Sequence, residues 1–244
     1  TPPPTGDKEL AEEYKRTLDP FVALTAAAVV TTKLEIGTGI ALVAQRDPIV
    51  TAKAVATLDL LSGGRFVLGV GFGWNEDEAE SHGLDFASRR FVAREHVLAM
   101  KALWSSDVAA FAGEHVRIAP SFSWPKPVRM PPVLLGGMGG PKLFADIAEW
   151  GDGWIPIGGA GIAKSMPLLR EAMEARGRDP KALRIVPFGT IPGDPAKIAY
   201  YADNGVTETV FRLPSAPRDQ VLPVLDRCVE TIAQVGLRLL ASPF

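Results

Sequence analysis

Two glycine-rich segments contain the residues of this chain best suited to hold a charged group. The first, residues 136–140, follows an apolar segment and precedes Pro141; it consists of Gly136, Gly137, Met138, Gly139 and Gly140. The second, residues 157–161, follows the next apolar segment and includes Ile157, Gly158 and Gly159. Glycine lets a phosphate approach backbone N–H groups closely, and a helix that starts there adds free donors and a favourable dipole. Glycine also serves plain turns, but two such segments in succession favour a phosphorylated ligand.

Groups that could act as acids, bases or metal ligands are sparse at the carboxyl ends of the expected strands. We find no lysine, histidine or carboxylate pair there, which argues against a Schiff-base aldolase and a metal hydrolase, so we expect no metal site. His82, His96 and His115 are interpreted as surface or packing residues. We therefore identify no catalytic residue. Hydride transfer is compatible with this, because a redox cofactor supplies most of its chemistry.

Composition narrows the class of protein further. The 244 residues are 47% hydrophobic with a formal net charge of -2, and no basic stripe is interleaved with aromatics, so nucleic acid is not an expected partner. The single cysteine, Cys228, lies in a helical pattern and is interpreted as a packed thiol, in keeping with a reducing, cytoplasmic compartment. Residues 21–30 are too few to cross a bilayer, and residues 1–5 lack the features of a signal peptide, so no membrane association is expected.

The elements that would position the glycine segments alternate between strand and helix. Continuous apolar runs predict six strands, typical of a parallel sheet covered on both faces, at residues 34–43, 65–71, 132–135, 153–157, 183–190 and 207–213. Asp-Pro pairs predict three helix starts, with an N-capping aspartate before proline in the first turn, at Pro20, Pro48 and Pro195. Glycines predict helix ends at Gly63, Gly177 and Gly205.

Repeated strand–helix units predict an α/β fold, either an open doubly wound sheet or a TIM (β/α)8-type barrel. Residues 69–73 come close to a dinucleotide fingerprint but lead into an acidic segment, so we favour the barrel. Because a barrel needs eight strands, we expect its first β-α-β to lie upstream of Thr1; a six-stranded open sheet is the alternative. We expect a single domain over residues 1–235, with a C-terminal tail at 236–244.

The combination of motifs resembles the bacterial luciferase-like monooxygenase family, and within it the branch of coenzyme F420 (deazaflavin)-dependent oxidoreductases. The resemblance spans nearly the whole chain and rests on residues 37–40, 46–48, 56–66, 68–74, 136–137, 151–154 and 205–208. It implies an oxidoreductase that transfers a hydride between F420 and a small organic substrate. The alternatives are an FMN-dependent monooxygenase, a non-catalytic flavin- or deazaflavin-binding barrel, and a phosphosugar isomerase, which lacks the strand-end carboxylate or lysine that it needs. A homodimer is possible.

The resemblance also implies which residues contact the cofactor. It places a non-proline cis peptide bond at Gly39-Ile40, with Ala41 next to it, behind the cofactor ring. It places residues Gly71, Phe72, Gly73 and Asn75 beside the ring, and the two glycine segments at the phosphate and ribityl chain. FMN-using luciferases carry an arginine near the position of Phe72, and a phenylalanine here favours the deazaflavin.

Two further segments could contact substrate. Aromatic residues in segments 111–116 and 122–127 form an insertion that could cap an apolar substrate or simply build a hairpin at the rim of the barrel. Arg212, late in the last expected strand, could bind a ligand anion, but an ion pair with Glu208 is the favoured interpretation.

Overall fold

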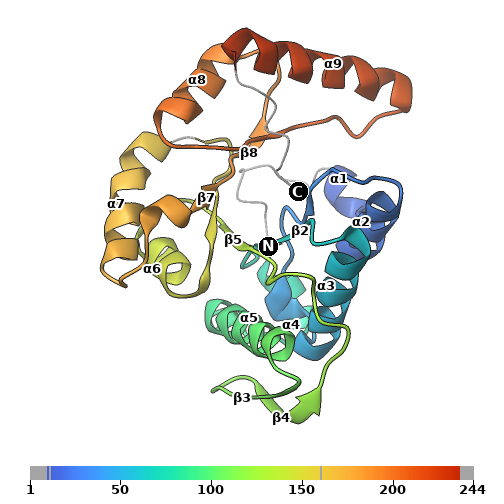
Figure 1. Ribbon diagram of the computed structural model, residues 1–244, viewed down its shortest axis with the longest axis vertical. Coiled ribbons are helices and arrows are strands. Elements are labelled where there is room, and N and C mark those ends of the chain that lie inside the picture. The colour runs from blue at the N-terminus through green and yellow to red at the C-terminus, as the bar shows by residue number, and fades with distance from the viewer. Residues whose placement is uncertain (1–9, 11, 160, 237–244) are drawn as a thin grey trace. The chain divides into compact units, whose positions relative to one another are not determined.

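The computed structural model describes residue 10 and residues 12–159 and 161–236 (Figure 1). The chain folds into two compact units, Thr1–Val133 and Leu134–Phe244. Both units contain parallel strands joined through helices, as the sequence predicts. In the described part of the chain, no helix has the length and apolar character needed to cross a membrane.

The first unit is built around two parallel strands. Its elements are, in order, α1 (Glu12–Lys15), α2 (Pro20–Val29), β1 (Ile36–Gly37), the 3-10 turn η1 (Val43–Gln45), α3 (Pro48–Ser62), β2 (Phe66–Val70), α4 (Glu76–Ser81), α5 (Arg89–Ser105), β3 (Val108–Ala112) and β4 (Arg117–Phe122). Ile36 lies opposite Phe66, and a bridge from Ala41 to Val70 continues the pairing beyond β1. Helix α3 packs against both α2 and α5. Every residue of β2 is buried, which explains its continuous apolar sequence.

The second unit repeats the strand–helix pattern. It comprises β5 (Val133–Gly136), which starts at the unit boundary, followed by α6 (Pro141–Trp150), β6 (Gly153–Ile155), α7 (Ile162–Glu174), the 3-10 turn η2 (Pro180–Ala182), β7 (Arg184–Ile185), β8 (Phe188–Thr190), α8 (Pro195–Asp203), β9 (Val210–Phe211) and α9 (Arg218–Val235). Strands β5, β6 and β7 pair in parallel, as do β8 and β9. Helices α6 and α7 pack against one another (Figure 1).

The predicted Asp-Pro helix starts are confirmed. The Asp47 carboxylate accepts hydrogen bonds from the N–H groups of Ile49 and Val50 at 2.9 and 2.8 Å, and Asp19 and Asp194 cap α2 and α8 in the same way. At the other end of α3, Gly63 adopts a φ of 67°, the left-handed conformation expected of a glycine that ends a helix. The local signals at helix ends were therefore sufficient to place these helices.

Several predictions need correction. The strands expected over residues 34–43 and 207–213 are shorter: the first is limited to β1 and a bridge at Ala41, and the second to β9. The strand expected over residues 183–190 is divided into β7 and β8, because Pro187 between them has no N–H to donate. Glu208 pairs with Arg184, at 2.8 Å from Nε and 2.5 Å from Nη2, rather than with Arg212. Residues four positions apart in an extended segment such as that around β9 are roughly 13 Å apart along the chain, whereas Arg184 lies within hydrogen-bond distance of Glu208. Cys228 is buried in α9, as predicted, and burial raises the pKa of its thiol.

The insertion between β2 and β5 contains an antiparallel hairpin of β3 and β4 that is clamped to α5. The buried carboxylate of Glu95 accepts backbone hydrogen bonds from Glu114, His115 and Val116 at 2.8, 2.7 and 2.9 Å. Burial opposes ionisation of Glu95, but these three N–H groups outweigh it and lower the pKa of the carboxyl below its usual value. The predicted hairpin is confirmed, and a contact of its aromatic residues with substrate stays a prediction.

We expect Glu95→Gln to destabilise the protein by about 2 kcal/mol at neutral pH, because charge-assisted hydrogen bonds at the hairpin turn are lost. A lowered native pKa contributes stability that is complete above the unfolded-state pKa and is lost as the pH falls through the native one. The difference in unfolding free energy between parent and variant, measured in urea, should therefore shrink as the pH falls below about 4. If the difference in unfolding free energy between parent and variant did not change with pH, the negative charge of Glu95 would not be what stabilises the hairpin.

Candidate functional site

In the first unit, the segment after β1 carries the predicted cis peptide bond at Gly39-Ile40, which is confirmed. The segment is tied to β2: the Thr38 hydroxyl donates to the Gly69 carbonyl oxygen at 2.7 Å, and the Ala41 N–H donates to the same oxygen at 2.8 Å. The Ile40 side chain lies against Gly71, where an added Cβ would come within 2.2 Å of Ile40 Cδ1. Glycine at position 71 therefore leaves room for the Ile40 side chain, which would have to shift if a larger residue stood there.

The segment after β2 places the predicted ring-side residues in defined conformations. Gly73 has a φ of 75°, and its carbonyl oxygen accepts from Arg89 Nε at 3.2 Å. The Asn75 side chain caps α4, accepting from the Glu78 N–H at 3.4 Å. The guanidinium of Arg90 lies over the Phe72 ring, 3.9 Å from its centroid. A positive charge therefore lies next to Phe72. The sequence did not predict this contact, because Arg90 belongs to α5, which is separated from Phe72 by α4.

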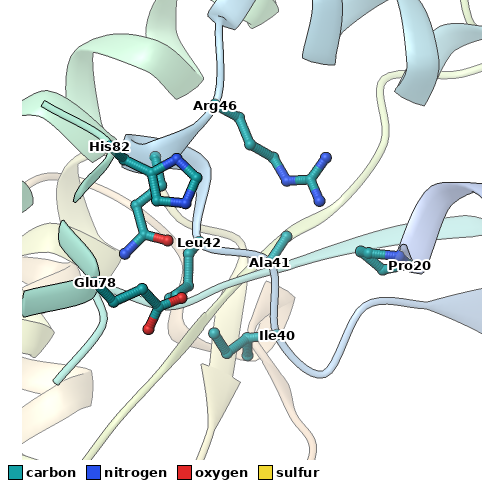
Figure 2. Close-up of a pocket in the computed structure, with 8 residues that line it drawn as sticks. Pro20, Ile40, Ala41, Leu42, Arg46, Glu78 and His82 are labelled. Atoms are coloured by element: carbon teal, nitrogen blue, oxygen red, sulfur yellow. The ribbon is translucent and has the colours of Figure 1, made fainter. Parts of the chain in front are cut away.

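A cavity of about 440 Å³ lies beside the cis peptide, entirely within the first unit (Figure 2). One part of its lining is apolar and consists of Pro20, Ile40, Ala41 and Leu42. The rest is polar and consists of Gln45, Arg46, Glu78 and His82. The volume is within the range of small-molecule sites. His82 is exposed, as the sequence suggested, yet it lines this cavity, and no sequence signal related it to residues 40–46.

In the second unit, the first glycine segment connects β5 to α6, and its glycines differ in backbone conformation and in the space around them. Gly137 has a φ of 149°, and its carbonyl oxygen accepts from Trp154 Nε1 at 2.9 Å. A Cβ added to Gly139 would lie 2.7 Å from Ser165 Oγ. Gly140 differs: its φ of 170° is extended, and a Cβ added there would meet no heavy atom within 4 Å. The space next to Gly140 at the N-terminus of α6 is therefore not filled by atoms of the described residues.

The N-terminus of α6 fits an anion better than the aspartate-capped helices do. No side chain caps it, and its first turn has no acidic residue. The helical hydrogen bonds begin with Phe144 N donating to Gly140 O at 3.0 Å, so the N–H groups of Lys142 and Leu143 precede them. Lys142 places a positive charge where the helix dipole disfavours one. An anionic ligand would accept hydrogen bonds from these N–H groups and would offset the positive charge of Lys142.

The second glycine segment precedes α7 and is supported by two tyrosines of α8. Gly158 and Gly159 have φ angles of 65° and 64°. The Tyr201 hydroxyl donates to the Gly158 carbonyl oxygen at 3.3 Å, and a Cβ on Gly159 would come within 2.4 Å of the Tyr201 ring. The Tyr200 hydroxyl accepts from the Ala163 N–H at 3.2 Å, in the first turn of α7. Ile157 is exposed next to this segment, and residue 160 lies outside the described part of the chain.

The other two histidines have structural surroundings. His96 is buried in α5, where its Nδ1 lies 2.9 Å from the Val43 carbonyl oxygen, and burial lowers the pKa of its imidazole. His115 lies in the β3–β4 turn held by Glu95. Among the described residues, no group of three or more His, Cys, Asp or Glu side chains is arranged to hold a metal ion.

Comparison with known sequences identifies both a family and individual relatives. Residues 7–195 match the family described as luciferase-like monooxygenase. An uncharacterized protein of Mycobacterium tuberculosis is 43% identical over 234 residues, which cover 95% of this chain and 82% of that protein. An F420-dependent glucose-6-phosphate dehydrogenase of Amycolatopsis mediterranei is 33% identical over 160 residues, which cover 62% of this chain and 48% of the enzyme.

Solved structures show the same fold at low identity. The monooxygenase RslO1 from Streptomyces bottropensis has a TM-score of 0.76 at 19% identity, covering 88% of this chain and 82% of that one. The oxygenating constituent of 3,6-diketocamphane monooxygenase from Pseudomonas putida, solved in complex with FMN, has a TM-score of 0.64 at 16% identity, covering 81% and 60%. These likenesses confirm the predicted α/β fold class, of the TIM-barrel type. That an opening β-α-β lies upstream of Thr1 stays a prediction.

Proposed function

Because this chain belongs to the luciferase-like monooxygenase family, we propose that it is an oxidoreductase that transfers a hydride between coenzyme F420 and a small organic substrate. Relatives of this chain include an enzyme named as F420-dependent, and its structural neighbours include a monooxygenase solved with FMN. A deazaflavin or flavin cofactor is thus consistent with both the relatives and the local structure. When bound, such a cofactor accepts or donates the hydride, and the protein supplies binding and orientation.

The observation that carries this proposal is the open N-terminus of α6. Three helices of this chain begin with a capping aspartate, but α6, which follows the first glycine segment, has none. Its unpaired first-turn N–H groups, its lysine and the open space at Gly140 together suit a phosphate. We propose that Gly136, Gly137, Met138, Gly139 and Gly140 contact the phosphate, with Ile157, Gly158 and Gly159 at the ribityl chain.

The ring contacts are proposed from the first unit. Gly39, Ile40 and Ala41 offer the cis peptide segment and an apolar surface that is tied to β2. Gly71, Phe72, Gly73 and Asn75 follow β2 immediately, and two of them are fixed by the close approach of Ile40 and by the cap of α4. A flat apolar ring binds well to an apolar surface whose conformation is already fixed by contacts within the protein before the ligand binds.

FMN-dependent oxygenation is the second candidate, and the position of Arg90 favours it. The cation over Phe72 could replace the arginine that FMN-using luciferases carry near this position. Phe72 itself and the F420-dependent relative favour the deazaflavin. The two candidates predict opposite orders of affinity, so one titration separates them.

The test is binding of each cofactor to the purified protein, followed by fluorescence or absorption in equilibrium titrations. We expect F420 to bind at least tenfold more tightly than FMN, a difference of about 1.4 kcal/mol. Tighter binding of FMN would favour the monooxygenase, and binding of neither would overturn the proposal. A bound cofactor whose reduction is not accelerated by alcohols, nor its oxidation by carbonyl compounds, would indicate a binding protein without turnover.

A further inference from the structure

We propose that the cavity in Figure 2 binds a small hydroxy or oxo acid, with Arg46 on its carboxylate and His82 on its hydroxyl or carbonyl oxygen. This inference rests on the proposed function for its redox step, but not for the binding itself. Figure 2 shows Glu78 and His82 on one side of the cavity and Arg46 toward the other, with Ala41 between them. The cavity thus presents a cation and a proton-transfer group to a single ligand.

Arg46 is held in place before any ligand binds. Its Nη2 lies 2.7 Å from Asp19 Oδ2, and its guanidinium lies over the Phe21 ring, 5.1 Å from the centroid. Asp19 is fixed in turn by the N–H groups of Phe21 and Val22, and the hydrogen bond from Arg46 is the main reason that its pKa is lowered. Among the described residues, Asp19 is the one hydrogen-bond partner of the Arg46 side chain. A guanidinium has five N–H donors, so most remain for a carboxylate.

Glu78 and His82 lie four residues apart on α4 and at its C-terminal cap, and therefore on one face of that helix. Helix α4 is fixed by the Asn75 cap and by the buried Ala79. Within the described part of the chain, neither the Glu78 carboxylate nor the His82 imidazole makes a hydrogen bond or ion pair. Both groups are therefore available to a ligand in the cavity.

The charges of the lining define the class of ligand. Arg46 attracts an anionic group, and the planar fork of its guanidinium matches a carboxylate. Glu78 repels a second anionic group at the opposite end, beside His82. An uncharged hydroxyl or carbonyl suits that end, because an imidazole can either donate or accept a hydrogen bond. The expected ligand is thus a monoanion, such as a small hydroxy acid or the corresponding oxo acid.

The position of the cavity relates this ligand to the proposed chemistry. Ile40 and Ala41 line it, and both are among the residues that we propose to contact the cofactor ring. In oxidation, the carbinol carbon loses a hydride to the oxidised deazaflavin, and the hydroxyl proton passes to His82. The products are the oxo acid, the reduced cofactor and a proton that leaves from His82 to solvent. Glu78 is a positioning residue, because it would stabilise the imidazolium that forms.

The first test measures binding without any cofactor. Imidazole signals of His82, His96 and His115 are followed by NMR while the protein is titrated with lactate or with propan-2-ol, its neutral counterpart. We expect lactate to shift the His82 signals selectively, and Arg46→Gln or replacement of lactate by propan-2-ol to weaken binding at least fivefold. Arg46→Lys, which keeps the charge, should retain more affinity than Arg46→Gln. An unmoved His82 signal, or equal shifts in Arg46→Gln, would overturn the site.

The second test addresses the proton transfer. In protein loaded with F420, His82→Gln should lower kcat for lactate, 2-hydroxybutyrate or mandelate by at least a hundredfold, with less than a threefold change in KM. Glu78→Gln, which keeps the shape of the side chain but removes its charge, should lower kcat with little change in KM, because the Glu78 carboxylate would no longer stabilise the imidazolium of His82. No cofactor reduction by any of these acids at saturating concentration would overturn the redox step. Because the NMR titration needs no cofactor, its outcome is independent of whether F420 binds.

Discussion

Gly140→Asp is expected to weaken cofactor binding about a hundredfold, which corresponds to ~2.7 kcal/mol, while leaving the protein folded. Position 140 has extended backbone and open space, so the substituted side chain fits. An aspartate at this N-cap should stabilise α6, as Asp47 does for α3, yet its carboxylate would occupy and repel the proposed phosphate position. Titration with F420 and with FMN measures the loss of affinity, and thermal melts check the fold.

Gly140→Asn is the matched control for this prediction. Asparagine caps a helix about as well as aspartate and has nearly the same shape, but it has no charge. We expect it to weaken binding by less than tenfold, so the ratio between the two variants isolates the electrostatic term. Equal affinities of parent, Gly140→Asn and Gly140→Asp would show that the glycine segment is only a turn. The phosphate assignment would then be wrong, whatever cofactor the protein binds.

Gly153→Ala should destabilise the second unit by about 3 kcal/mol, at the upper end of what overpacking costs. A Cβ at this position would lie 2.1 Å from the carbonyl oxygen of Arg184 and 2.7 Å from a methyl of Leu134. The first contact is with backbone of the paired strand β7, which cannot rotate away as a side chain can. Urea denaturation followed by far-UV circular dichroism measures the change in unfolding free energy.

The control is Gly177→Ala, in the same unit. Gly177 has a φ of 67°, but a Cβ added there would meet no heavy atom within 4 Å. Only the cost of a left-handed alanine remains, about 1 kcal/mol. If both variants lose the same stability, the close approach at Gly153 is not what determines the cost, and the glycine serves backbone conformation alone.

Much of the architecture follows from local signals. The Asp-Pro pairs placed the starts of α2, α3 and α8, because a carboxylate cap and a proline in the first turn depend only on neighbouring residues. The continuous apolar runs located β2, β5 and β6, since parallel strands are buried on both faces. The predicted pair of Arg212 and Glu208 was wrong, because Glu208 instead pairs with Arg184, which is distant in the sequence and comes close only in the tertiary structure.

The glycine segments and the cis peptide could be named from the sequence, since glycine and motif order are visible there. The cavity could not be predicted from the sequence. Arg46 follows β1 and η1, whereas Glu78 and His82 come from α4, and only the pairing of β1 with β2 brings these segments to one cavity. The Arg90 guanidinium over Phe72 is likewise a contact between segments separated by α4. Residue types and their local order thus determine the elements and the family, whereas packing between distant segments decides which side chains can share a ligand.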